Sequence, residues 1–254
     1  MANENDPIGE LVELSHWLGD PGRDLAILGE GNTSVSLAPG RLAVKASGAG
    51  LGKVGREHFV EVDPGRVLSI LDRAEVRDEE LAGHLAACRI SGDRRPSIEV
   101  VLHALAVREA GAKFVAHAHP TVVNGVLCSD RADALVAGHL FPDQVVVLGR
   151  HPLLVPYAEP GLELARTVKA ALAGHLASHG APPKIVYLRN HGILVLGETA
   201  TDVRQAVEMT VKVARILTAA LAVGEPAYLT SDQADRIEGR EDEHHRRSVL
   251  ARQG

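Results

Sequence analysis

The feature that most constrains the fold is a predicted helix followed at once by a short predicted strand. Pro96 and Ser97 precede apolar side chains that recur at helical spacing over residues 98–110, and Gly111 ends this run. Residues 113–119 then form a predicted strand. Because the connection between helix and strand is so short, the two must be packed neighbours. This pairing indicates an α/β fold.

The rest of the chain alternates between predicted helices and strands. Further helices are expected over residues 7–18, 162–178 and 200–223. Further strands are expected over residues 25–28, 34–37, 42–45, 59–62, 145–147 and 153–155. Two short strands are expected within residues 184–196, on either side of residues 189–192. Residues 66–90 show no clear pattern, and residues 231–254 are expected to form a peripheral helical tail. No repeat or linker divides the chain, so we predict one domain over residues 1–254.

Composition and charge argue against several classes of protein. Aromatic residues make up 3% of the chain, so the core must be built from Ala, Val, Leu and Ile, which suits α/β packing. The net charge is −6 and there is no basic stripe, which argues against nucleic-acid binding. No apolar run approaches the ~20 residues of a membrane span, and the N-terminus shows no signal-peptide pattern. The chain has two cysteines, Cys88 and Cys128, which are distant in sequence, and this argues against a disulfide framework. We therefore expect a cytoplasmic protein.

His117 and His119 carry the sharpest chemical signal. They lie two residues apart in the predicted strand, and alternate residues of a strand project from the same face. Two imidazoles that converge in this way can hold a divalent ion, and catalytic zinc sites use three protein ligands and keep one position open. An isolated pair of this kind can equally be two ordinary histidines, but the surrounding motifs favour a metal site.

His191 is the best candidate for the third ligand. It lies in Asn190-His191-Gly192, directly after a predicted strand that begins at Ile185. Glycine adopts backbone angles that other residues cannot, so we expect Gly192 to allow a sharp turn that aims the histidine.

Glu99 lies near the start of the helix that packs against the histidine strand. A carboxylate at a helix N-terminus is stabilised as an anion by the helix dipole. It could be a fourth metal ligand, a general base or both in turn. A glutamate at this position can also have no role beyond stabilising the helix through its dipole. His103 lies four residues on, on the same helix face, and is expected to support the site rather than to bind the metal.

Two loops rich in glycine, hydroxyl and amide groups leave predicted strands, at residues 29–34 and 45–50. Small residues let the backbone approach a ligand, and hydroxyl, amide and N–H groups suit phosphate oxygens. Ser97, at the start of the Glu99 helix, adds a further donor. The spacings match neither a Walker loop nor a dinucleotide fingerprint, and turn formation alone could also explain both loops.

Together these segments resemble the class II aldolase/adducin family, in particular its fuculose- and rhamnulose-1-phosphate aldolases. The motifs that carry the resemblance are, in order, Gly31-Asn32-Thr33-Ser34, Ser47-Gly48, Pro96-Ser97-Ile98-Glu99 with Leu102-His103, His117-Ala118-His119-Pro120, Val155-Pro156-Tyr157 and Asn190-His191-Gly192. Their order and spacing agree with the family over about residues 8–225, the expected core of the domain.

The resemblance implies a three-layer αβα fold with a central, mainly antiparallel sheet. It implies a homotetramer with active sites between subunits, a small-molecule substrate and a divalent metal, zinc first and manganese or cobalt as alternatives. The implied metal ligands are His117, His119 and His191, with Glu99 as acid/base. The implied phosphate- and substrate-binding residues are Asn32, Ser47, Gly48 and Ser97. A tyrosine often assists in this family, and the candidates are Tyr157, Tyr187 and Tyr228.

The implied reaction is retro-aldol cleavage of a ketose 1-phosphate through a metal-stabilised enediolate. One departure weakens the phosphate site, because Ile98 stands where fuculose-type aldolases usually carry a second serine. It favours the first alternative, metal-dependent decarboxylation of a small hydroxy or keto acid; epimerisation or dehydration of a sugar phosphate also stays open. The second alternative is a non-catalytic, adducin-like assembly module, which would be expected to lack the ligands that are present here.

Overall fold

The computed structural model describes residues 6–37 and 40–240. These residues contain one sheet, in the strand order β4-β3-β2-β1-β5-β8-β7-β6. The strands are β1 (Asn32–Ser36), β2 (Leu42–Lys45), β3 (Phe59–Val62), β4 (Arg89–Ser91), β5 (Phe114–Ala118), β6 (Leu153–Val155), β7 (Ile185–Leu188) and β8 (Gly192–Gly197). Every neighbouring pair is antiparallel except β6 and β7, so the sheet is mainly antiparallel, as predicted.

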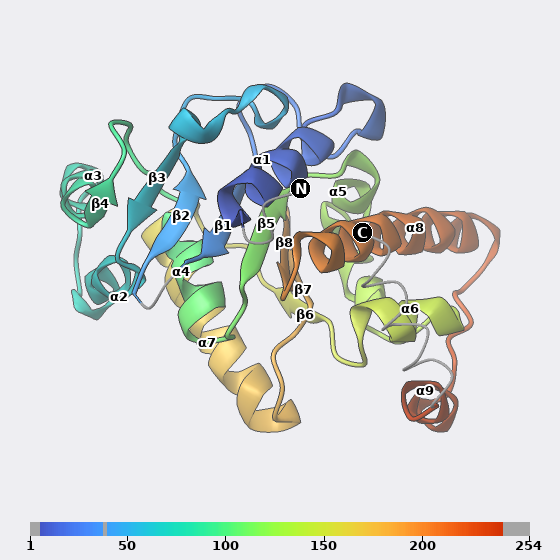
Figure 1. Cartoon of the computed structure of the whole chain (residues 1–254). Helices are drawn as coiled ribbons and strands as arrows, with labels where there is room; N and C mark the ends of the chain where they lie inside the picture. The colour runs from blue at the N-terminus through green and yellow to red at the C-terminus, as the bar shows by residue number, and fades with distance from the viewer. Residues whose placement is uncertain (1–5, 38–39, 241–254) are drawn as a thin grey trace.

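Helices cover both faces of the sheet (Figure 1). One face packs against α1 (Pro7–Leu18), α5 (Thr121–Leu127) and α8 (Ala200–Val223). The other face packs against α2 (Pro64–Leu68), α3 (Asp78–Ala87), α4 (Val100–Arg108) and α7 (Leu162–His179). The remaining helices are α6 (Pro142–Leu148) and α9 (Ser231–Glu238), which contact each other. The predicted three-layer αβα architecture is therefore confirmed. Within the described residues, no helix combines the length and apolar character that crossing a membrane requires.

The two faces arise from the alternation of side chains along each strand. In β5, Phe114 and Ala116 belong to the core under α8, whereas Val115 belongs to the core under α4 and α7. In β8, Ile193 and Leu194 divide in the same way. Such strands are apolar on both faces because both faces are buried. The alternation also determines the face from which each functional side chain of β5 projects.

Most predicted elements are present, and the bounds of α8 agree with the sequence prediction. This helix begins at Ala200 because Thr199 and Asp202 cap its first turn reciprocally: the Thr199 hydroxyl accepts from the Asp202 amide and the Asp202 carboxylate from the Thr199 amide, at 3.0 Å each. The unassigned segment 66–90 contains most of α2 and all of α3 and begins β4. Of the expected tail, residues 231–238 form α9, and residues 241–254 lie outside the described residues.

Two strand predictions are wrong. Residues 145–147 lie in α6, which begins at Pro142, a residue whose fixed backbone angle suits the first helical turn. A short run of valines cannot by itself distinguish a buried strand from a buried helix. Residues 25–28 form no strand, because Leu28 adopts a left-handed conformation, with φ of 52°, and closes a turn.

Leu105 provides a test of the packing that holds α4, and hence Glu99, against the sheet. Its side chain is fully buried in the core under α4 and α7. Leu105→Ala should lower the free energy of unfolding by about 2–5 kcal/mol, because it removes buried methyl groups and leaves a cavity. Urea denaturation measures the change. Arg108→Ala, an exposed site on the same helix, should change it by less than about 0.5 kcal/mol; equal effects of the two substitutions would contradict the packing.

Candidate metal centre

Strand β5 contains His117, and His119 directly follows its last residue. His117 is fully buried and pairs in register with Asn32 of β1 and Leu194 of β8. It lies two residues from Val115, so it projects from the α4 face of the sheet. His119 follows one residue after the strand ends, and its backbone N–H donates to the carbonyl oxygen of Leu25 at 2.9 Å. The two Nε2 atoms lie 3.0 Å apart.

His191 comes from the turn between β7 and β8. Its N–H donates to the carbonyl oxygen of Leu188 at 3.1 Å, which closes the turn. The left-handed residue of this turn is Asn190, with φ of 55°, and not Gly192 as the sequence suggested. Gly192 is required for a different reason: a Cβ there would lie 2.5 Å from the carbonyl oxygen of Ala118 and 2.5 Å from Cδ2 of His119. The missing side chain lets the turn approach the histidine strand.

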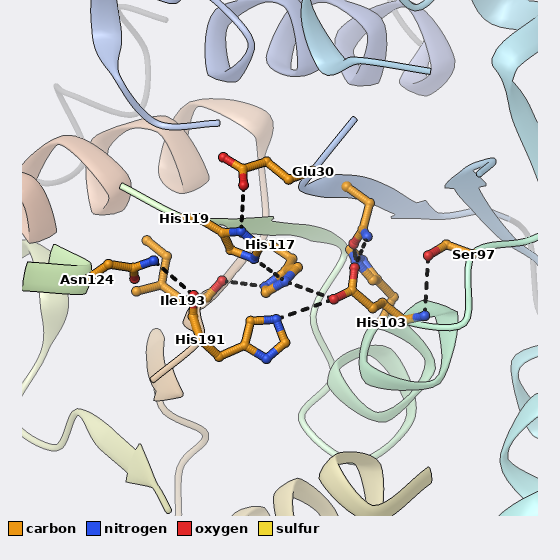
Figure 2. Close-up of polar contacts among 10 residues, drawn as sticks. Glu30, Ser97, His103, His117, His119, Asn124, His191 and Ile193 are labelled. Atoms are coloured by element: carbon orange, nitrogen blue, oxygen red, sulfur yellow. Dashed lines mark hydrogen bonds and ion pairs between the residues drawn. The ribbon is translucent and has the colours of Figure 1, made fainter. Parts of the chain in front are cut away.

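The three imidazoles meet around one point (Figure 2). Their ring centroids lie 4.7, 4.9 and 5.2 Å apart, and one ligand atom of each lies within 4.8 Å of the others. In the described part of the chain they are the one group of this kind that could hold a metal ion. Oε1 of Glu99 faces the same point, 3.2 Å from Nε2 of His117 and 3.4 Å from Nε2 of His191.

The hydrogen bonds of two histidines determine which nitrogen carries a proton. Nδ1 of His117 lies 2.9 Å from the carbonyl oxygen of Ile193, and Nδ1 of His119 lies 3.1 Å from Oε2 of Glu30. A carbonyl or a carboxylate oxygen can only accept, so each Nδ1 is the donor. In the neutral rings both Nε2 atoms then present lone pairs to each other. Two lone pairs at this distance repel, so a proton or a metal cation is needed at this point; three imidazoles with one carboxylate suit zinc or a similar ion. The residues therefore fit a divalent metal.

The electrostatics of the cluster favour a negative carboxylate beside positive charge. Burial alone would raise the pKa of Glu99, but His117, His191 and Asn32 together hold the pKa of this carboxyl well below its usual range. Burial would likewise lower the pKa of His117, yet the neighbouring carboxylate of Glu99 raises it above its ordinary value. The pKa of His119 is lowered by burial and by the positive charge that His117 can carry. The site thus strongly favours an anionic Glu99 beside positive charge.

Glu99 is held by a chain of buried polar groups. It lies directly before the first residue of α4, and its Oε2 accepts from Nδ2 of Asn32 at 2.6 Å. The amide oxygen of Asn32 contacts Nε2 of His103, whose Nδ1 lies 2.7 Å from the hydroxyl of Ser34. Burial lowers the pKa of His103 to about 3, so the ring is neutral. His103 thus orients Asn32 and makes no contact with the three-histidine cluster.

The predicted substrate loops lie beside the start of α4. Ala46 pairs with Pro96 in an isolated bridge, and the N–H of Ser47 donates to the carbonyl oxygen of Arg95 at 3.1 Å. These contacts bring the exposed Ser47-Gly48 pair to the segment that contains Ser97. Gly48 has φ of 90°, which a side chain would disfavour. The Ser97 hydroxyl accepts from the Glu99 N–H at 3.3 Å, so it closes the turn that leads into α4.

Two residues that contact the cluster were missed by the sequence analysis. Glu30 contacts His119, and Nδ2 of Asn124 donates to the carbonyl oxygen of His191 at 2.9 Å. A signal for Glu30 was present, because a lone carboxylate between two glycines precedes Asn32. No sequence signal distinguishes Asn124, which reaches the turn only through the packing of α5 against β8.

The three tyrosines occupy different environments. Tyr187 is fully buried and points to the α8 face, away from the metal centre. The hydroxyl of Tyr228 donates to the carbonyl oxygen of Ala134 at 2.9 Å. Tyr157 is 51% exposed, and its hydroxyl donates to Glu159 at 2.9 Å. Of the three, Tyr157 has the most exposed side chain, whereas Tyr228 is partly exposed.

A family model described as "Class II Aldolase and Adducin N-terminal domain" matches residues 9–218. The chain belongs to this family. The predicted family is therefore confirmed, and the match covers nearly all of the predicted core, residues 8–225. The family places the chain among the class II aldolase superfamily of enzymes, in which the three histidines could hold a divalent metal.

Individual relatives show how far this likeness extends. The uncharacterized oxidoreductase YuxG of Bacillus subtilis (strain 168) is 28% identical over 202 residues, which make up 76% of this chain but 27% of YuxG. The 3-oxo-tetronate 4-phosphate decarboxylase of Haemophilus influenzae is 27% identical over 219 residues, which make up 86% of this chain and 90% of that enzyme. A structure of L-fuculose 1-phosphate aldolase matches with a TM-score of 0.68 at 22% identity, covering 92% of this chain and 95% of the other, which shows a shared fold.

Gly192 gives a test of the close approach between the turn and the histidine strand. Gly192→Ala should destabilise the protein by about 1–3 kcal/mol, because the new methyl group would overlap the backbone of Ala118 and the ring of His119. Thermal unfolding measures the change. Gly174→Ala is the matched control, since Gly174 lies in α7 with open space around it, and should stabilise the protein by about 0.5–1 kcal/mol. A neutral Gly192→Ala would show that the approach is looser than described.

Proposed function

We propose that this protein is a metal-dependent carbon–carbon lyase that decarboxylates a small 3-oxo acid carrying a phosphate group. The observation that carries the proposal is the convergence of three imidazole nitrogens and the Glu99 carboxylate on one point. The choice of decarboxylation is supported by the Haemophilus influenzae enzyme, which aligns with the chain over most of both sequences. A divalent ion, with zinc first and manganese or cobalt as alternatives, would act as a Lewis acid that polarises the substrate carbonyl.

Glu99 is the proposed acid/base. Loss of carbon dioxide from a 3-oxo acid breaks one carbon–carbon bond and leaves its electron pair on the neighbouring carbon as an enolate. One proton at that carbon then completes the product. Glu99 faces the cluster from the start of α4, and Asn32 holds Oε2, so Oε1, which points at the cluster, is the oxygen that would pass this proton and recover it from water. The proton count balances with water as the only co-reactant.

The phosphate end of the substrate is proposed to lie over the two loops beside α4. Asn32, Ser47, Gly48 and Ser97 are the proposed contacts. Backbone N–H groups and hydroxyls at the start of a helix suit an anion, and the bridge between Ala46 and Pro96 holds these groups together. Ile98 adds no hydroxyl to this pocket; its side chain is 46% exposed and lies next to Gly161.

Retro-aldol cleavage of a ketose 1-phosphate is the second candidate. It is favoured by the motif Pro96-Ser97-Ile98-Glu99, which resembles rhamnulose-phosphate aldolases. This reaction also needs a polarised carbonyl to accept the electron pair of the broken bond. It differs in which carbon–carbon bond breaks, and Glu99 would take the proton of a substrate hydroxyl as that bond opens. Purified protein loaded with zinc should release carbon dioxide from 3-oxo-tetronate 4-phosphate. Release of dihydroxyacetone phosphate from a ketose 1-phosphate, with no carbon dioxide from the oxo acid, would favour the aldolase instead.

We also propose that the protein acts as a homotetramer whose active sites lie between subunits. Exposed apolar side chains support an interface near the site, because Ile27 and Leu28, at 58% and 91% exposure, lie in the loop that contacts His119. An exposed Tyr157 is then the tyrosine available to a neighbouring subunit. Sedimentation velocity of the purified protein tests this assembly, and a monomer at micromolar concentration would contradict it.

Glu99→Gln provides the test of the acid/base role. The amide keeps the shape of the side chain but cannot take up and return a proton, so turnover should fall about 10²- to 10⁴-fold. Zinc content should be retained, because the three histidines remain. Glu109→Gln, at the other end of the same helix and exposed, is the matched control and should leave both quantities unchanged. Full activity of Glu99→Gln with either substrate would refute the role.

A further inference from the structure

We propose that Glu30 is a positioning residue of the metal centre: its carboxylate accepts the Nδ1 proton of His119 and thereby presents the Nε2 lone pair of that ring to the metal. The inference rests on the proposed metal site and assigns to it a carboxylate from a segment remote in sequence. Figure 2 shows Glu30 reaching His119 from the side opposite to His117 and His191.

The contact is direct and only partly exposed. Oε2 of Glu30 lies 3.1 Å from Nδ1 of His119, with side-chain exposures of 30% and 19%. Ligand histidines in metalloproteins commonly donate their second ring N–H to a carboxylate or a carbonyl, which determines the tautomer and makes the ring a better ligand. Here both kinds of acceptor are used, since His117 donates to the carbonyl oxygen of Ile193. Nδ1 of His191, in contrast, is buried with no partner in the described residues.

Hydrogen bonds in the turn that contains Glu30 fix the position of this carboxylate. The N–H of Glu30 donates to the carbonyl oxygen of Ile27 at 3.1 Å, and Oε1 of Glu30 accepts from the N–H of Ile27 at 2.7 Å. The side chain and the main chain of one residue thus close the same turn. Inside the turn Leu28 has φ of 52°, a conformation that costs a non-glycine residue about 1–2 kcal/mol. Strain of this size persists where surrounding contacts over-determine it, and it is common near functional sites.

The same turn is attached to the histidine strand at two further points. The N–H of His119 donates to the carbonyl oxygen of Leu25 at 2.9 Å, and the hydroxyl of Thr121 donates to Asp24 at 2.9 Å. Gly31 follows with φ of 71°, and a Cβ there would lie 2.9 Å from the carbonyl oxygen of His117. Glu30 therefore has few alternative positions, and its second oxygen reaches His119 without further rearrangement.

The test compares zinc affinity among three variants by competition with a chromophoric chelator. Glu30→Ala removes the acceptor and should weaken zinc binding about 10- to 100-fold. Glu30→Gln retains a neutral acceptor oxygen and should fall between Glu30→Ala and the original protein. Glu109→Ala is the control: it removes a carboxylate of the same charge from the exposed end of α4, and its zinc affinity should stay within about twofold, as for a surface change.

A second readout reports the proton itself. In the zinc-bound protein, proton–nitrogen NMR should show a protected Nδ1–H resonance for His119, and this resonance should disappear in Glu30→Ala. If the resonance persists in that variant, or if Glu109→Ala weakens zinc binding as much as Glu30→Ala, the carboxylate is not the orienting group and the inference is wrong. If the original protein binds no zinc, the metal centre and the proposed function fail together, which is a distinguishable result.

Discussion

The structure depends on one electrostatic constraint: three imidazole rings and a carboxylate oxygen converge on a single point. Because Ile193 and Glu30 can only accept, the Nδ1 protons of His117 and His119 are directed away from that point, and the two Nε2 atoms face each other at 3.0 Å. Without positive charge between them, these atoms repel. A divalent cation could supply that positive charge, and the partly buried carboxylate of Glu99 would balance it.

The fold meets this constraint with elements that are distant in sequence. The antiparallel pairing of β5 with β1 and β8 sets Asn32, His117 and Leu194 side by side. The turn before β8 then brings His191 to the same edge, which is possible only because Gly192 has no side chain to meet His119. The start of α4 supplies Glu99 from the adjoining layer. Two covered faces are needed, because a one-layer sheet could not exclude water from both the ligands and their supporting hydrogen bonds.

Much of the site was predictable because its signals are local. The His117 and His119 pair needs only the two-residue period of a strand, and Glu99 needs only its place at a helix start. Glu30 was not assigned, because its place between two glycines marks a carboxylate but not its partner, and the contact with His119 depends on a left-handed turn at Leu28. The same turn explains why residues 25–28 were wrongly predicted to be a strand. Residues 145–147 were misread for another reason: α6 is defined by Pro142 and by packing against α8, which a short valine run does not reveal.

The choice between the two proposed cleavages depends on the surroundings of the bond rather than on the metal. Both reactions leave an electron pair next to a polarised carbonyl, so the cluster and Glu99 serve either. The two reactions need different surroundings for the group that reacts. Apolar neighbours destabilise the substrate carboxylate and so favour its loss as uncharged carbon dioxide. A substrate hydroxyl that must be bound and deprotonated needs polar neighbours instead. Ile98 is 46% exposed beside Gly161, in a family position where a serine hydroxyl is usual for fuculose-type aldolases. The missing hydroxyl agrees with the proposed decarboxylation, whereas the whole motif around it resembles rhamnulose-phosphate aldolases, so the two proposed reactions are separated by the bond that each substrate presents and not by this residue alone.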